Sequence, residues 1–213
     1  MKVIDLSQTL ENGMAVYPGA PIPKFERLGS VKDGDAYQLI KFEMTTHVGT
    51  HLDCQTHVKT SGFSADSQDL GFFIGQGIVI DCSKYGPGSV MGMEIFDGVN
   101  LSGKEFVLLY CDWAKRWYEP SFWGEYPVLS KEAIEFLANN KEIRGLGVEY
   151  AAIDPLADAA LTLHKIFLAA EKTIIENLTN LDKLIGKDFQ FIALPLKFKD
   201  GDGSPVRPVA IIE

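Results

Sequence analysis

Short apolar runs separated by turn-forming residues make up the first half of the chain. Residues 2–6, 37–46, 78–82 and 106–111 are rich in aliphatic, aromatic or β-branched side chains and are bounded by glycine, polar or charged residues, a pattern typical of β-strands. The segment 17–21, Tyr-Pro-Gly-Ala-Pro, separates the first two runs. Because proline fixes its own φ and restricts the residue before it, we expect extended and turning backbone there.

Helical spacing begins only in the second half. Ser130 carries a side chain suited to cap a helix that runs to about residue 139, with apolar residues at helical intervals. A second helix is predicted over residues 166–178, where apolar side chains again recur every three to four positions. These two helices are the only long ones that the pattern predicts.

Three further strands are expected between and after the helices, over residues 145–150, 189–196 and 209–212. The Asp-Gly-Asp-Gly of residues 200–203 predicts a plain turn, since the glutamate that closes a calcium-binding loop is missing. Strands mixed with a few helices predict an α/β fold, with a mixed β-sheet core and flanking helices. No repeat or linker divides the chain, so we expect a single domain over residues 1–213.

Composition and charge narrow the classes of function. With 46% hydrophobic and 23% charged residues, the chain resembles an ordinary globular protein with one sizeable core. A net charge of −9 disfavours binding to nucleic acid or to a membrane surface. The N-terminus is too polar for a secretory signal, and no apolar stretch approaches the ~20 residues of a membrane span. We therefore expect a soluble, cytoplasmic protein that acts on a small molecule.

Three of the four histidines lie within eleven residues, in the segment 47–57. His47, His51, Asp53 and His57 all have odd numbers, and in extended backbone residues at even separation point to the same face. The segment therefore predicts a strand that presents imidazole and carboxylate groups on one face. The residues expected to point into the core instead are Val48, Thr50 and Leu52.

The spacing of these groups also predicts a bend. A fully extended strand would separate His47 from His51 by ~13 Å, at ~3.3 Å per residue. Two imidazoles at ~2.0–2.1 Å from one ion cannot span that distance without strain, and Gly49 is the residue best able to bend the chain. Nitrogen and carboxylate ligands without thiolates suit Zn, Mn or Fe in a catalytic site. The sequence thus predicts a catalytic metal site.

The segment HVGTHLDCQTH at 47–57 resembles the HxGTHxDxxxH pattern of the cyclase-like metal-dependent hydrolases, a family that includes bacterial kynurenine formamidase. Similarity extends over most of the chain, through VYPGAP, LLYCDWAKRW, LHKIFLAAEKTIIENL, FIALPLKF and SPVRPV. The resemblance implies the swivelling β/β/α type of fold found in that family. It also implies a homo-oligomer, with residues near Tyr17 at the interface.

The resemblance further implies roles for individual residues. His47, His51 and Asp53 match ligands of a first metal ion, and Asp53 also matches a bridge to a second. His57 matches a catalytic proton shuttle, and Tyr17 falls where kynurenine formamidases carry a substrate-contacting Trp. The remaining two matches are His164, a ligand of the second metal, and Glu176, a carboxylate shared by both ions.

Helix geometry leaves open which glutamate of the C-terminal half, Glu176 or Glu171, supplies the shared carboxylate. Twelve residues of continuous helix would separate His164 from Glu176 by ~18 Å along the axis, too far for one site. Either His164 lies before the predicted helix, or Glu176 is misassigned and Glu171 takes its place. Glu171 is seven positions from His164, so that in a helix it lies near the same face.

The implied activity is hydrolysis of a small amide or formamide, such as N-formylkynurenine, with Zn or Mn, one or two ions per chain, and His57 as proton shuttle. Ring opening of a cyclic amide or lactone, as in isatin hydrolases, is the alternative within the family. A metal-binding or ligand-sensing protein without turnover is the alternative outside enzymes, and the presence of His57 favours an enzyme. Two departures from the kynurenine formamidase pattern leave the identity of the substrate open: Tyr17 stands in place of a Trp, and the segment Cys54-Gln55-Thr56 lacks the usual proline.

Overall fold

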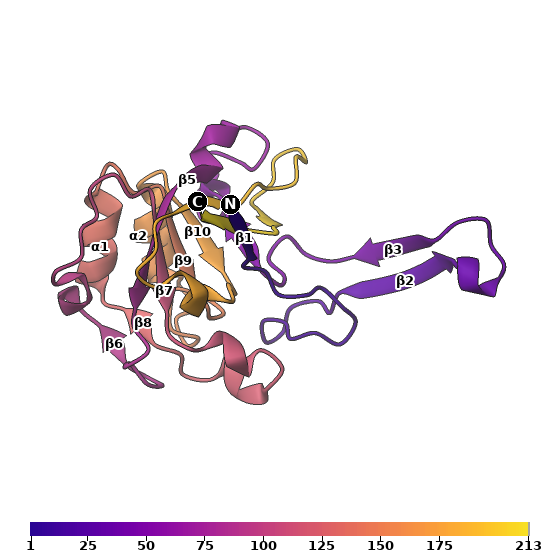
Figure 1. Ribbon diagram of the computed structural model, residues 1–213, viewed down its shortest axis with the longest axis horizontal. Coiled ribbons are helices and arrows are strands. Elements are labelled where there is room, and N and C mark those ends of the chain that lie inside the picture. The colour runs from indigo at the N-terminus through magenta and orange to yellow at the C-terminus, as the bar shows by residue number, and fades with distance from the viewer. Residues whose placement is uncertain (213) are drawn as a thin grey trace.

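A nine-stranded mixed sheet forms the centre of the computed structural model, which describes residues 1–212 (Figure 1). Its strands are β1 Lys2–Asp5, β4 His51–Asp53, β5 Ile74–Asp81, β7 Phe106–Tyr110, β9 Gly145–Val148, β10 Thr173–Glu176, β11 Phe189–Ile192, β12 Gly203–Pro205 and β13 Val209–Ile212. Their order is β1-β13-β11-β5-β7-β9-β10-β4-β12. The four central strands from β5 to β10 run parallel, and both flanks are antiparallel. The predicted α/β fold with a mixed sheet is confirmed.

Two helices and two small sheets complete the fold. The helices are α1 Lys131–Asn139 and α2 Thr162–Ala169, which pack against each other. The small sheets are the hairpin of β2 Lys24–Gly29 and β3 Leu39–Glu43, and the parallel pair of β6 Val90–Met91 and β8 Val128–Leu129. In Figure 1 the β2–β3 hairpin projects far from the body of the molecule, whereas both termini lie on the body. Within residues 1–212 no helix has the length and apolar character to cross a membrane.

The main sheet separates two hydrophobic cores. Because successive side chains of a strand point to opposite faces, β7 contributes to both. Val107 and Leu109 pack in the core that contains the apolar residues of α1 and α2. Phe106 and Leu108 pack in the second core with residues of β10, β11 and β13. The near-continuous apolar sequence of β7 is therefore explained by burial on both faces.

The first predicted helix is confirmed, and its start has the expected cap. The Ser130 hydroxyl accepts a hydrogen bond from the backbone N–H of Ala133 at 3.2 Å, and α1 follows directly. Ile134 and Leu137 are fully buried on its inner face. The serine therefore satisfies one of the N–H groups that a helix leaves free at its start.

The prediction of a second helix over residues 166–178 is wrong over most of that range. The helix α2 starts earlier than predicted and ends at Ala169, Glu171 turns the chain with φ +59°, and β10 begins at Thr173. The apolar positions of 173–176 belong to a strand buried on both faces, whose short apolar run also fits helical spacing. The β-branched run Thr-Ile-Ile favours the strand, and pairing with β9 and β4 fixes it.

Most predicted strands exist with shifted ends. The strand predicted over 78–82 begins earlier, as β5, and the one predicted over 189–196 ends at Ile192. The strand predicted over 37–46 is shorter and belongs to the projecting hairpin rather than to the main sheet. The alternation of apolar residues predicts that these strands exist. Where each strand ends depends on how far the neighbouring strand pairs with it.

Candidate active site and metal centre

The motif segment bends at Gly49 and becomes a strand only at His51. Gly49 has φ +60°, a conformation that side chains other than glycine rarely adopt, and a Cβ there would collide with the Leu10 side chain. The bend brings the His47 and His51 rings to 5.2 Å between centroids. The predicted bend at Gly49 is confirmed. Each of the three intervening side chains is buried, as the alternation predicts: Val48, Thr50 and Leu52.

Strand pairing brings Glu176 to the motif. In the antiparallel register of β10 and β4, Glu176 lies directly opposite His51, and Ile175 lies opposite Leu52. Opposed residues share a face of the sheet, so the Glu176 carboxylate points to the same side as the His51 ring. Their atoms Oε2 and Nε2 are 3.4 Å apart. Glu171, the alternative carboxylate, lies exposed on the turn after α2 and outside the cluster.

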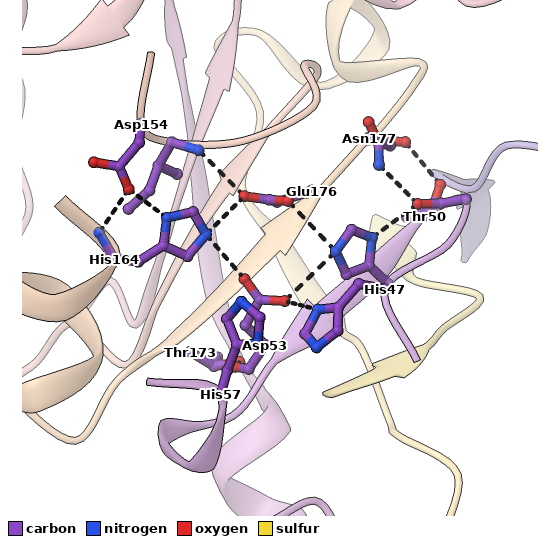
Figure 2. A network of polar contacts seen from close by, with 12 residues as sticks. His47, Thr50, Asp53, His57, Asp154, His164, Thr173, Glu176 and Asn177 are labelled. Atoms are coloured by element: carbon purple, nitrogen blue, oxygen red, sulfur yellow. Dashed lines mark hydrogen bonds and ion pairs between the residues drawn. The ribbon is translucent and has the colours of Figure 1, made fainter. Parts of the chain in front are cut away.

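His164 enters from the first turn of α2 and is oriented by Asp154. The Asp154 carboxylate accepts hydrogen bonds from the backbone N–H groups of Leu163 and His164 and from Nδ1 of the His164 ring at 2.5 Å. The anionic carboxylate also suits the positive end of the helix dipole. With Nδ1 committed to Asp154, Nε2 of His164 faces Asp53 and Glu176 (Figure 2).

The buried donors form two symmetric groups around two shared carboxylates. Nε2 of His51 lies 3.5 Å from Oδ1 of Asp53 and 3.4 Å from Oε2 of Glu176. Nε2 of His164 lies 3.3 Å from Oδ2 of Asp53 and 3.2 Å from Oε1 of Glu176. His47 joins the first group, with Nδ1 at 2.7 Å from Oδ1 of Asp53. Each carboxylate thus offers one oxygen to each group (Figure 2).

This donor set fits divalent metal ions. Nδ1 of His51 donates to the backbone oxygen of Gly49 at 2.9 Å, so Nε2 is the ring nitrogen that faces the carboxylate oxygens. Oδ2 of Asp53 is buried and has no hydrogen-bond partner among residues 1–212. Buried carboxylate oxygens normally have partners, and a cation between the facing atoms supplies them. Potential ligand atoms lie within 4.8 Å of one another in the triads His47-His51-Asp53 and Asp53-His57-His164.

His57 and Asp202 lie at the open side of this cluster. His57 ends a short 3-10 turn, and its ring centroid is 4.0 Å from that of His47. Oδ2 of Asp202 lies 3.1 Å from Nε2 of His47 and 3.8 Å from Nδ1 of His57. The sequence interpretation missed Asp202, because a turn signal alone does not distinguish a side chain that points into a site. It also missed Asp154, for which no spacing signal exists.

Burial and charge shift the ionisation of the cluster. Burial lowers the pKa of His47, but the carboxylates of Asp53 and Asp202 outweigh it and raise that pKa to about 10. Burial is the largest cause that lowers the pKa of His57 below its usual value. The hydrogen bond to His47 is the main cause that lowers the pKa of Asp202. The pKa values of Asp53 and Asp202 are thus lowered and that of His57 lies below its usual value, which suits cation binding by the two aspartates and proton acceptance by His57.

A cavity of about 420 Å³ opens beside the donors. Its size falls in the ~300–1,000 Å³ range of small-molecule sites. Tyr17 lines it and contacts Trp123 edge to face at 6.0 Å between ring centroids. Trp117 also lines the cavity, whereas Trp113 is buried elsewhere and donates to the backbone oxygen of Phe122. The residues that the sequence interpretation selected thus lie around one cavity: Tyr17, His47, His51, Asp53, His57, His164 and Glu176.

Comparison with known proteins gives a consistent result. A family model described as a putative cyclase matches residues 4–155. Kynurenine formamidase from Bacillus anthracis is 33% identical over 208 residues, which cover 98% of this chain and 96% of that protein.

Solved structures share the whole fold. Isatin hydrolase A from Ralstonia solanacearum superposes with a TM-score of 0.88 at 26% identity, covering 100% of this chain and 92% of that one. A protein from Bacillus stearothermophilus described as a predicted metal-dependent hydrolase superposes with a TM-score of 0.78 at 25% identity, covering 98% and 97%.

Asp154 gives a direct test of the metal centre. We expect Asp154→Asn to weaken binding of Zn²⁺ or Mn²⁺ by ~10–100-fold, because the amide no longer fixes the tautomer and orientation of His164. Competition with a chromophoric chelator measures the affinity.

The matched control is Asp158→Asn. Asp158 also accepts backbone N–H groups near the start of α2, but no hydrogen bond or ion pair links it to the imidazole among residues 1–212. Its substitution should leave metal affinity within ~2-fold of wild type, since support of the ligand is intact. Equal affinities for both variants and wild type would contradict a metal site built on His164.

Proposed function

The chain belongs to the cyclase family, and from that membership we propose that it is an arylformamidase-like enzyme that uses metal to hydrolyse a small amide or formamide. The observation that carries the proposal is the convergence of His51 and His164 on the shared carboxylates Asp53 and Glu176 beside an apolar cavity. Isatin hydrolase and kynurenine formamidase, both hydrolytic enzymes, share this fold or sequence. Their relationship to the chain makes hydrolysis of a C–N bond the reaction class.

The reaction adds water across the amide. A C–O bond forms at the carbonyl carbon, the C–N bond breaks, and the leaving nitrogen takes up a proton, so that a formamide gives formate and an amine. A divalent cation held by the donor cluster would lower the pKa of bound water and would polarise the carbonyl oxygen. The proposed ligands are His47, His51 and Asp53 for one ion, and His164 for a second, with Asp53 and Glu176 shared.

His57 is the proposed proton carrier. Its ring lines the cavity beside His47, and its side chain is half-buried rather than locked among carboxylates. A neutral imidazole can take the proton of the attacking water and give it to the leaving nitrogen, since imidazole titrates near working pH. Tyr17 and Trp123, whose rings contact each other edge to face beside the cavity, are the proposed contacts for the flat face of an aromatic substrate.

The donor chemistry supports Zn as the metal, with Mn as the alternative. Imidazole nitrogen and carboxylate oxygen ligands suit both ions, and catalytic zinc sites commonly combine them. The two donor groups that share Asp53 and Glu176 support two ions per chain.

Ring opening of a cyclic amide is the second candidate reaction. It uses the same steps, except that both products stay in one molecule. The close superposition with isatin hydrolase A favours it.

We expect hydrolysis to depend on metal. Protein stripped with a chelator should not hydrolyse an aryl formamide or isatin, and stoichiometric Zn²⁺ or Mn²⁺ should restore turnover, because the donor cluster needs a cation to activate water. Product absorbance measures the rate, and elemental analysis measures the metal. A metal-loaded protein that hydrolyses neither amide class would exclude the proposed function.

Replacing His57 separates proton transfer from metal binding. We expect His57→Gln to lower kcat by ~10²–10⁴-fold, the usual contribution of general acid–base catalysis, while bound metal stays at the wild-type ratio. Elemental analysis of the same preparation serves as the control. Loss of metal together with activity would instead identify His57 as a ligand.

We also propose that the chain forms a homo-oligomer through the β2–β3 hairpin. In this ribbon Phe25 opposes Phe42, with ring centroids 6.2 Å apart, and Ile40 shares their face. Ile40 and Phe42 are 48% and 55% exposed. An isolated two-stranded ribbon is marginally stable in water, so an exposed apolar face on it favours contact with another molecule.

A second copy of the chain is the occupant that we propose for this face. The Asn12 side chain holds the ribbon in a fixed direction, because it donates to the backbone oxygen of Phe25 and accepts from its N–H. A patch that every molecule presents in the same rigid orientation can meet its own copy about a twofold axis.

The two faces of the hairpin give a matched test. Phe42→Glu should convert the oligomer to a monomer, because it places a charge in the apolar face. Lys41→Gln changes the net charge equally on the opposite face, where Lys41 pairs with Glu26, and should keep the assembly. Sedimentation velocity at micromolar concentration measures both. A monomeric wild type, or an unchanged Phe42→Glu assembly, would disprove the hairpin contact.

A further inference from the structure

The Asp-Gly-Asp-Gly turn of residues 200–203 packs against the first histidine of the motif. The backbone oxygen of Asp202 accepts a hydrogen bond from the Cys54 N–H at 2.9 Å, and Gly203 lies opposite Asp53 in the pairing of β12 with β4. The last residue of the turn therefore belongs to the sheet that carries the candidate ligands. A segment whose sequence predicts only a plain turn thus forms one wall of the candidate metal centre.

This turn contacts the His47 ring on two sides. Oδ2 of Asp202 lies 3.1 Å from Nε2 of the ring. A Cβ on Gly203 would lie 2.6 Å from Cε1 of the ring and 2.7 Å from the backbone oxygen of Leu52, which is closer than Cβ atoms come in real structures. Glycine, which has no Cβ, leaves room for the imidazole there. The turn therefore supplies both the space for the ring and a polar partner for it.

The other two candidate histidine ligands each commit Nδ1 to an acceptor. Nδ1 of His51 bonds to the backbone oxygen of Gly49, and Nδ1 of His164 bonds to the carboxylate of Asp154. Both rings thereby turn Nε2 to the shared carboxylates. In each ring one nitrogen has a fixed partner behind it, and the other faces the position of an ion.

His47 has the opposite orientation. Its Nε2 faces Asp202, and its Nδ1 lies 2.7 Å from Oδ1 of Asp53. The Asp53 side chain is 1% exposed, and its Oδ2 has no hydrogen-bond partner among residues 1–212, whereas the Asp202 side chain is 43% exposed and reaches water. A buried carboxylate needs a cation more than a hydrated one does. Nδ1 is therefore the nitrogen that faces an ion, and Nε2 is the one that faces a support.

We propose that Asp202 is the positioning residue of His47: Nε2–H of the ring donates to Oδ2 of Asp202, and the ring coordinates the first metal ion through Nδ1. The inference rests on the proposed metal centre, and it specifies which atom binds and which residue orients it. A carboxylate behind a ligating imidazole fixes the tautomer and orientation of the ring and makes the ligating nitrogen more basic. Asp202 thus does for His47 what Asp154 does for His164.

The same side chains allow one competing arrangement. Ligand atoms of His47, His57 and Asp202 also lie within 4.8 Å of one another. An ion on this open side would take Nε2 of His47 and would make Asp202 a ligand. Burial of Asp53 favours the first arrangement, and the nitrogen of His47 that carries the ion distinguishes the two.

Nuclear magnetic resonance with cadmium identifies the coordinating nitrogen. In protein loaded with NMR-active Cd²⁺, an ion on Nδ1 couples to Hε1 of the ring but not, over the longer path, to Hδ2, whereas an ion on Nε2 couples to both protons. We expect the His47 ring to couple through Hε1 alone, and the His51 and His164 rings to couple through both protons. Loss of the His47 signals in His47→Gln assigns them.

Either of two results for His47 would overturn the inference and leave the metal centre intact: coupling of Cd²⁺ to Hδ2, or coupling to neither ring proton while the other rings couple. Absence of coupling to all four histidine rings of the chain would reject the metal centre and the inference together.

A matched pair of substitutions in the turn tests the support. Asp202→Asn should weaken binding of one of the two Zn²⁺ ions by ~10–100-fold, because a charged support of the ligand is lost, and should leave the affinity for the other within ~2-fold. Asp200→Asn removes the same charge from the same turn and should keep both affinities. The Asp200 side chain is 82% exposed beside Lys199, and its φ of +57° suits asparagine.

Competition with a chromophoric chelator measures both Zn²⁺ affinities, and thermal unfolding of the metal-free proteins checks that each variant folds. Equal affinities for the Asp202→Asn and Asp200→Asn variants, or equal weakening of both ions by Asp202→Asn, would show that Asp202 does not position His47.

Discussion

The close approach of two imidazole nitrogens to two buried carboxylates is the constraint on which the site depends. Nε2 of His51 and Nε2 of His164 both point at oxygens of Asp53 and Glu176, because each ring commits its Nδ1 to an acceptor behind it. In a region shielded from water, buried carboxylates need a cationic partner, and the neighbouring imidazoles, whose pKa values the carboxylates raise, or a metal ion can provide it. The fold holds these groups at short distances through contacts that lie outside the cluster.

The surrounding elements show how that arrangement is held. The Thr173 hydroxyl donates to the backbone oxygen of Asp53, and the Thr50 hydroxyl donates to that of Asn177, so that β4 and β10 are linked at both ends of their short pairing. Asp154 fixes the start of α2, because its carboxylate accepts hydrogen bonds from the backbone N–H of Leu163 and from the His164 ring. A strand, its antiparallel neighbour and a capped helix thus fix the candidate ligands from three directions.

The cavity adjoins the candidate metal centre, whereas the hairpin lies apart from it. The cavity is lined mostly by apolar side chains beside the candidate ligands, and charges in such surroundings act more strongly than charges in solvent. The hairpin takes no part in the ligand cluster, and its apolar face has the character of a contact surface. The candidate metal site and the exposed apolar face of the hairpin therefore lie in separate parts of the chain.

The sequence alone determined those features that depend on single residues or short segments. The motif at 47–57 predicted the imidazole and carboxylate groups of the candidate metal site and the bend at Gly49, because side-chain chemistry and backbone freedom are properties of single residues. Family resemblance pointed to Glu176, but helical spacing argued against it, since a short buried strand and a helix share the same apolar pattern. Only tertiary structure decided that β10 pairs with β4, that Glu176 faces His51, and that Asp154 and Asp202 reach the site. These contacts join residues far apart in the sequence, and strand register and loop packing, which no local pattern encodes, bring them together.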